Sequence, residues 1–140
     1  MKFLHLNYLP RSADTALLLL RIWYGGALLL LHGWGKLTNF SSMAANFADP
    51  FGIGKTPSLV LVIFAEVVCA TMIALGMFTR AAALVATINM GAAFWFGHGA
   101  KLTGRGNDGE LAFLFLGVFL ALFFAGGGKF SVDSKLGAKG

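Results

Sequence analysis

The sequence predicts an all-α membrane protein: a four-transmembrane-helix bundle with a short interfacial helix between helices 1 and 2. Of the 140 residues, 57% are hydrophobic and only 12% are charged, and a soluble domain of this size is rarely so apolar. Four apolar stretches each approach the length that spans a bilayer. Because these stretches use most of the chain, residues 1–140 are predicted to form a single integral-membrane domain.

The first predicted span covers about residues 13–34. Ser12 is suited to cap its N-terminus, and Asp14 in the first turn suits the positive end of the helix dipole. A polar and aromatic stretch follows the span. It is predicted to hold the short interfacial helix at about residues 41–48, which the following Asp-Pro pair stops.

The second and third spans are predicted to form a tight hairpin. The second covers about residues 57–76, where Thr56 caps a helix with proline in its first position. Gly76 is a usual helix-stop residue. Thr79 then caps the third span, at about residues 80–97, so the connection is too short for anything but a hairpin.

The fourth span is predicted at about residues 108–125. It opens at Asn107 or Asp108 and ends at three consecutive glycines, Gly126 to Gly128. With this span the chain crosses the membrane an even number of times, which places both termini on one side.

The remaining composition excludes several classes of protein. The net charge of +5 comes from basic residues scattered at the ends of apolar segments, where flanking cations usually sit, so no nucleic-acid partner is predicted. Cys69 is the lone cysteine, which excludes an internal disulfide and a Cys-x-x-Cys redox centre. Arg21 interrupts the first apolar run and no small-residue cleavage site follows it, so this run is not predicted to be a cleavable signal.

Lysine and arginine counts favour a cytoplasmic location for both termini, in a bacterial or archaeal plasma (inner) membrane. The terminal side of the predicted bundle holds six basic residues: Lys2, Arg11, Arg80, Lys129, Lys135 and Lys139. The other side holds four: Lys36, Lys55, Lys101 and Arg105. On this topology Trp34 and Trp95 fall together at the outer interface, as in an aromatic belt.

Polar side chains inside the apolar spans form the candidate site, since an unpaired charge in hydrocarbon costs roughly 3 kcal/mol or more. Helix rise predicts two layers. Near the midplane lie Arg21, Glu66 and Asn89; at the outer rim lie His32, Lys36, His98 and Glu110. Two such layers predict a polar pocket that opens outward, in which Arg21 and Glu66 pair.

Each of these residues also has a plainer interpretation. Arg21 and Glu66 could serve only to fix helix register, and Lys36 could extend to the lipid headgroups. His32 and His98 could be interfacial residues without a task, although their predicted depth is also compatible with bis-histidine haem. Glu110 stands at capping-box spacing from the predicted start of its helix. No metal-binding motif is present.

A second alternative concerns the aromatic stripe on the fourth span, formed by Phe115, Phe119 and Phe123. Lipid contact or helix packing explains the stripe, and contact with a quinone ring is the sharper alternative.

An ordered set of motifs resembles the DoxX family. It consists of Arg21, Gly33-Trp34-Gly35-Lys36-Leu37, Glu66, Leu75-Gly76-Met77-Phe78-Thr79-Arg80, Gly97-His98 and Gly128-Lys129-Phe130-Ser131-Val132-Asp133. The set covers nearly the whole chain. The resemblance implies a four-helix membrane protein that associates with membrane redox assemblies, including quinone-linked sulfur oxidation and thiol or oxidative-stress systems. With a single cysteine, the chain cannot by itself carry out two-cysteine thiol–disulfide exchange.

Three functions remain open from the sequence. The first is a membrane subunit of a redox system, in which the polar pocket contacts a quinone. The second is a non-catalytic membrane anchor or scaffold for a soluble redox enzyme. The third is a small-molecule carrier with Arg21 and Lys36 as its positive walls. The expected partners are the lipid bilayer and either a partner redox protein or further copies of the chain. Whether the chain is itself an enzyme stays open.

Overall fold

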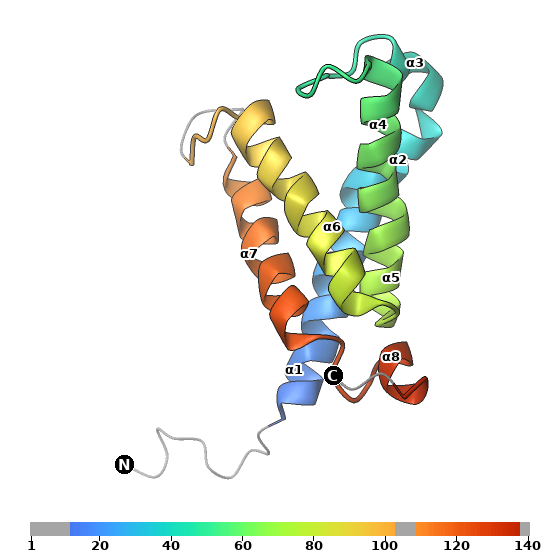
Figure 1. The fold of residues 1–140 in the computed structure, drawn as a ribbon, viewed down its shortest axis with the longest axis vertical. Coiled ribbons are helices and arrows are strands. Elements are labelled where there is room, and N and C mark those ends of the chain that lie inside the picture. Colours follow the sequence, from blue (N-terminus) through green and yellow to red (C-terminus); the bar gives the residue numbers. More distant parts are fainter. Residues whose placement is uncertain (1–11, 103–108, 138–140) are drawn as a thin grey trace.

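The computed structural model describes residues 12–102 and 109–137 of the chain, and all regular secondary structure in this part is helical, with no strand. Figure 1 shows long helices that run between two ends of the molecule. The end with α3 (Phe40–Ala44) is called the loop end, and the end with α8 (Val132–Lys135) is called the terminal end. The helix α1 (Ala13–Leu20) begins at the terminal end, so the first and last described residues lie on the same side of the bundle.

The first long helix is continuous from Ala13 to Thr38 and extends beyond the predicted end near residue 34. It comprises α1, two π-helical segments η1 (Arg21–Gly25) and η2 (Leu28–Gly33), and α2 (Trp34–Thr38). The predicted cap is confirmed, because the Ser12 hydroxyl accepts a hydrogen bond from the Thr15 amide at 3.1 Å. Wider π turns accommodate irregular packing within a helix, and the polar Arg21 and His32 both fall in them.

The connection to the second helix contains the predicted short helix, although α3 ends earlier than expected, at Ala44. Asp49 organises the rest of this connection. Its carboxylate accepts hydrogen bonds from the amides of Ile53 and Gly54 and from the Ser58 hydroxyl, at 2.8–3.0 Å. The second helix therefore begins at Lys55, after a glycine cap, and not at the predicted threonine cap.

The second helix continues through α4 (Lys55–Ile63), the π-helical η3 (Phe64–Cys69) and α5 (Ala70–Leu75). It ends as predicted at Gly76, which adopts the left-handed conformation with φ 71°. The first two helices are antiparallel and touch through glycine, since a Cβ at residue 25 would lie 2.9 Å from the carbonyl oxygen of Ala70.

The third and fourth helices form a second hairpin. The third comprises α6 (Thr79–Ala92) and the π-helical η4 (Ala93–Gly97), and the fourth is α7 (Glu110–Ala125). The small residues Ala82, Ala83 and Ala86 are fully buried, which lets neighbouring helices approach α6 closely. Asn107 and Asp108, the predicted start of the fourth span, lie outside the described residues.

The core lies between the two hairpins, around side chains such as Leu28, Ile73 and Phe119, each 0% exposed. The outward faces are also apolar: Trp23 and Leu31 are both 75% exposed. Two helices, Ala13–Thr38 and Lys55–Leu75, are long and apolar enough to cross a membrane. Such an apolar exterior suits contact with lipid.

A C-terminal strap, defined here as residues 126–136, folds back over the terminal end (Figure 1). The Asp133 carboxylate accepts hydrogen bonds from the Phe78 and Thr79 amides and from the Thr79 hydroxyl, at 2.7–2.8 Å. It thereby caps α6, the role that the sequence assigned to Thr79 alone. The Lys129 amide donates to Asp14 at 2.8 Å, which ties the strap to the first helix as well.

Candidate functional site

An ion pair between Lys36 and Glu66 forms the centre of the candidate site. The Lys36 Nζ atom lies 2.5 Å from Glu66 Oε2, and the Glu66 side chain is only 6% exposed. The sequence left open that Lys36 extends to the lipid headgroups; in the structure its ammonium group instead binds Glu66. A charge pair with so little access to water needs close geometry and further hydrogen bonds to be stable.

Gly33 explains why Lys36 reaches Glu66. A Cβ at residue 33 would overlap the backbone carbonyl of Glu66, so the absence of a side chain lets η2 and η3 touch at this level. Residues one helical turn apart share a helix face. Lys36, one turn after Gly33, is therefore held over the segment that carries Glu66.

A third helix contributes Asn89. Its side-chain Nδ2 donates to Glu66 Oε1 at 3.4 Å, at the long end of hydrogen-bond geometry. Glu66 thus accepts from both sides, with Lys36 on one oxygen and Asn89 on the other. The predicted proximity of Glu66 and Asn89 is confirmed.

His32 completes this cluster. Its ring packs edge-on against Phe115, with the centroids 5.8 Å apart, and it lies within electrostatic range of both Glu66 and Lys36. The Tyr24 ring also packs edge-on against Phe115, with the centroids 5.5 Å apart. We call Lys36, Glu66, Asn89 and His32 the polar cluster.

The aromatic stripe on the fourth helix reaches this cluster through Phe115, which contacts His32. Phe115 and Phe119 are 4% and 0% exposed, and their rings stack with centroids 5.7 Å apart. Packing, not lipid contact, therefore explains these two residues. Phe115 therefore places an aromatic ring beside His32 of the polar cluster, and Phe119 stacks behind it.

The predicted pair of Arg21 and Glu66 is wrong. Arg21 is fully buried at the terminal end, where its Nη2 donates to the Phe130 carbonyl oxygen at 2.6 Å. The error lies in the depth count, which set His32 level with the start of the second span. Because Gly33 lies opposite Glu66, His32 belongs to the Glu66 level, and Arg21 falls three turns lower, beside Gly76.

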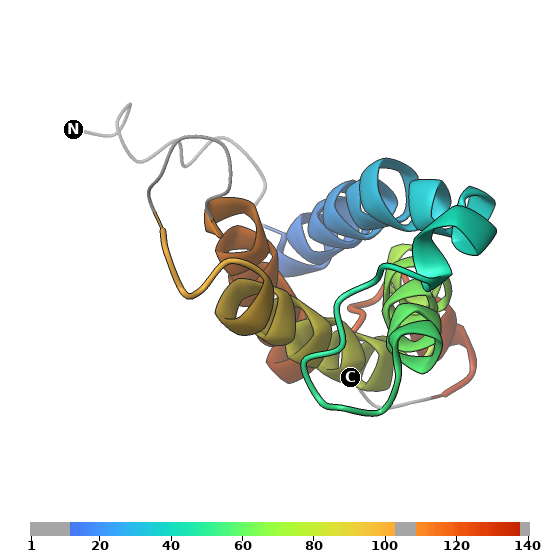
Figure 2. The same ribbon diagram turned by 90° about the horizontal axis from the view of Figure 1, so that it is seen from above.

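His98 and Glu110 do not join the polar cluster through any contact between described residues. His98 directly follows η4 and lies beside Gly109, where a Cβ would be 3.1 Å from the His98 Cβ, and Glu110 is exposed at the start of α7. Figures 1 and 2 show the reason: toward the loop end, the α6–α7 hairpin splays away from α2 and α4. The expected contact of His32 with His98 therefore gains no support.

The sequence reasoning missed the strap as a structural element. Partial burial of the Asp133 carboxylate opposes ionisation, but hydrogen bonds from Thr79 and Phe78 and the charge of Arg21 outweigh it and lower its pKa below the usual range. The sequence signal that could have indicated the strap is the Ser131-x-Asp133 motif after three glycines. Such residues commonly cap helices, but here Asp133 caps a helix distant in sequence.

Residues 12–102 and 109–137 contain no group of three His, Cys, Asp or Glu side chains close enough together to hold a metal ion. What the polar cluster can do is donate and accept hydrogen bonds beside aromatic rings. An ammonium, a carboxylate, an amide and an imidazole meet there, and the carboxylate and imidazole can also exchange protons.

The chain is similar to a known family and to a protein of another organism. The family model of DoxX matches residues 16–99, which include the whole polar cluster. An uncharacterised protein of Haemophilus influenzae is 31% identical over 115 residues, covering 77% of this chain and 81% of the relative. No solved structure matches the chain.

Proposed function

Since the chain belongs to the DoxX family of membrane proteins, we propose that it is an integral membrane subunit of a redox system and that its polar cluster contacts a quinone. The observation that carries the proposal is the buried Glu66 carboxylate, paired with the partly exposed Lys36, in a largely apolar bundle. Intramembrane ions are costly and by default functional.

The proposal includes the arrangement in the membrane. The helices that start at Ala13, Lys55, Thr79 and Glu110 form the four spans, with both termini in the cytoplasm of a bacterial or archaeal cell. The first two have the required length and hydropathy. The helix α7 has 16 residues and covers roughly 24 Å, which a locally thinned bilayer accommodates.

The chemistry of quinones fits the groups present. A quinone takes up two electrons and two protons to become a quinol, so its site needs hydrogen-bond donors at the carbonyl oxygens and a route for protons. Lys36 and Asn89 supply donors, while Glu66 and His32 can exchange protons. Phe115 and Tyr24 supply apolar surface for the ring. The electrons come from a partner redox enzyme.

The scaffold alternative has its own supporting observation. Glu66 already accepts from both Lys36 and Asn89, so the pair is complete without a ligand. Under that alternative the cluster only fixes the register of three helices. The carrier alternative loses its basis, because Arg21 and Lys36 bind different partners at different levels of the bundle.

Quinone extraction from the purified chain separates these functions. We expect the wild-type protein, extracted from its membrane in mild detergent, to retain quinone, and Lys36→Gln to lose most of it while remaining folded. Lys55→Gln is the matched control, because Lys55 is an exposed lysine bonded only to the Ala45 carbonyl among described partners. A wild-type protein that retains no quinone and is not labelled by a photoreactive quinone analogue would rule out the proposal.

A further inference from the structure

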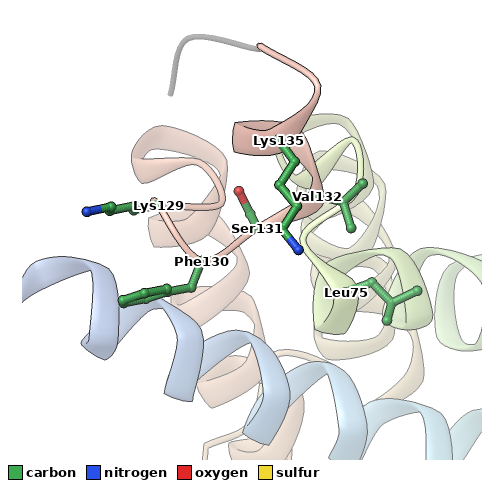
Figure 3. A pocket seen from close by; sticks show the side chains of 6 residues that line it. All are labelled: Leu75, Lys129, Phe130, Ser131, Val132 and Lys135. Atoms are coloured by element: carbon green, nitrogen blue, oxygen red, sulfur yellow. The ribbon is translucent and has the colours of Figure 1, made fainter.

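A pocket at the terminal end lies outside the polar cluster and has no part in the proposed function. It has a volume of about 270 Å³, and Figure 3 shows the six side chains that line it. They are Leu75, Lys129, Phe130, Ser131, Val132 and Lys135. Five of the six belong to the C-terminal strap, so the strap creates this pocket by folding back onto the end of α5.

The pocket combines positive charge with exposed apolar surface. In Figure 3 the Lys135 side chain extends across it, and Lys129 stands at its rim with its ammonium group pointing outward. Leu75 and Phe130 are 55% and 52% exposed beside these lysines. A basic group next to exposed apolar side chains matches the boundary between lipid headgroups and acyl chains.

Buried charge beneath the pocket adds to its positive potential. Arg21 is fully buried and holds the Phe130 carbonyl, while its Nε and Nη1 atoms have no hydrogen-bond partner among the described residues. Asp133 lies within electrostatic range of Arg21 and offsets part of this charge, while its oxygens accept hydrogen bonds from Thr79 and Phe78. Asp14 accepts from the Lys129 amide. Among the described residues, no carboxylate lines the pocket.

We propose that this pocket binds the phosphodiester headgroup of an anionic phospholipid, with Lys135 as its direct contact, Lys129 as a second positive charge at the rim, and Leu75 and Phe130 against the upper acyl chains. A bilayer lipid is the occupant that the observations favour, because the pocket joins the apolar face of a membrane helix at Leu75. The inference goes beyond the proposed function and requires only that the helices cross the bilayer, in either orientation.

Native mass spectrometry of the full chain in detergent tests this site. With phosphatidylglycerol and phosphatidylcholine of identical acyl chains, we expect at least tenfold tighter binding of phosphatidylglycerol. The double variant Lys129→Gln, Lys135→Gln should lower that preference to near unity. The matched control is Lys55→Gln, Lys101→Gln, which removes two exposed lysines from the loop end and should keep the preference.

Two outcomes overturn the inference. One is an unchanged preference in the Lys129→Gln, Lys135→Gln variant. The other is displacement of phosphatidylglycerol by millimolar inorganic phosphate, which would identify a site for free anions. The measurement adds no quinone and compares only two lipids, and the Lys129→Gln, Lys135→Gln variant is expected to retain quinone as the wild type does. Failure here is thus distinguishable from failure of the proposed redox role.

Discussion

At the scale of single residues, the buried Glu66 side chain governs the interior of the bundle. Its two oxygens accept from Lys36 and Asn89, which come from two other helices. A carboxylate with so little access to water is tolerated only while both partners remain. The polar cluster should therefore behave as one coupled unit, whether or not it also contacts a quinone.

A double-mutant cycle with Lys36→Met and Glu66→Gln measures that coupling. Removing Lys36 alone should lower the free energy of unfolding by about 3 kcal/mol, because Glu66 remains buried without its counter-ion. The double variant should recover much of this loss. Unfolding in detergent or bicelles gives the four free energies.

A second cycle, Arg21→Met with Glu66→Gln, is the control. Arg21 contacts Phe130 and not Glu66, and distant sites normally contribute additively. Strong coupling between Arg21 and Glu66, with additivity between Lys36 and Glu66, would contradict the structure.

Asp133 gives a residue-scale prediction about pH. Its folded pKa is below its ordinary value, so its contribution to stability is complete above the unfolded pKa and is lost as the pH falls through the folded one. Thermal stability should therefore decline as the pH falls below about 4. Asp133→Asn should cost about 1–2 kcal/mol at pH 7, because an amide NH2 replaces one of the two oxygens that accept hydrogen bonds and leaves its donors unpaired, and it should flatten this decline.

The matched control for Asp133→Asn is Glu110→Gln, which neutralises an exposed carboxylate at the other end of the bundle. Glu110→Gln should leave the decline of thermal stability at low pH unchanged. If thermal stability fell equally steeply with pH in Asp133→Asn and in wild type, the Asp133 cap would not cause the pH dependence.

At the scale of elements, close contacts at glycine determine how the first two helices meet. A Cβ at residue 33 would overlap the Glu66 backbone, whereas nothing lies within 4 Å of a Cβ at residue 35. Both residues are helical, so alanine gives each the same gain in helix propensity, up to about 1 kcal/mol. The two positions therefore separate packing from propensity.

Gly33→Ala should lower the unfolding free energy by about 1–3 kcal/mol, because η2 and η3 must move apart. Gly35→Ala should leave it unchanged or slightly raised. The thermal midpoints of the two variants in the same detergent provide the comparison. Equal midpoints would mean that the helices do not touch at residue 33.

Local signals in the sequence predicted the elements well, because helix length, caps and breakers act over a few residues. Ser12 and Gly76 show this, since each begins or ends its helix as predicted. The pairing of polar groups was not local. It depended on the relative height of two helices, which the Gly33 contact sets, and Arg21 was therefore assigned to the wrong level.

The strap shows the same limit at longer range. Asp133 caps a helix whose first residue, Thr79, is far away in sequence. A short polar motif gives no indication of which distant amides it will meet.

The polar cluster was half predicted: His32, Lys36, Glu66 and Asn89 come together, whereas Arg21, His98 and Glu110 do not join them.

At the scale of the whole molecule, the two ends of the bundle differ in character. The loop end carries α3 and the exposed Trp34 and Trp95. The terminal end carries the strap and its lysines. The cytoplasmic assignment of the terminal end rests on the lysine and arginine count, to which Lys2, Arg11, Arg105 and Lys139 contribute from outside the described residues. A direct measurement of sidedness is therefore the most informative test of the molecule as a whole.

Cysteine labelling in a Cys69→Ala background provides that measurement, because Cys69 is the only native thiol and is buried. Ser42→Cys and Lys101→Cys lie at the loop end, and Lys135→Cys lies at the terminal end. In intact cells a membrane-impermeant maleimide should label the first two and reach the third only after permeabilisation. Labelling of all three from one side would show that the helices do not cross the bilayer as proposed. Labelling of Lys135→Cys alone would reverse the orientation, with the four spans retained and the polar cluster opening toward the cytoplasm.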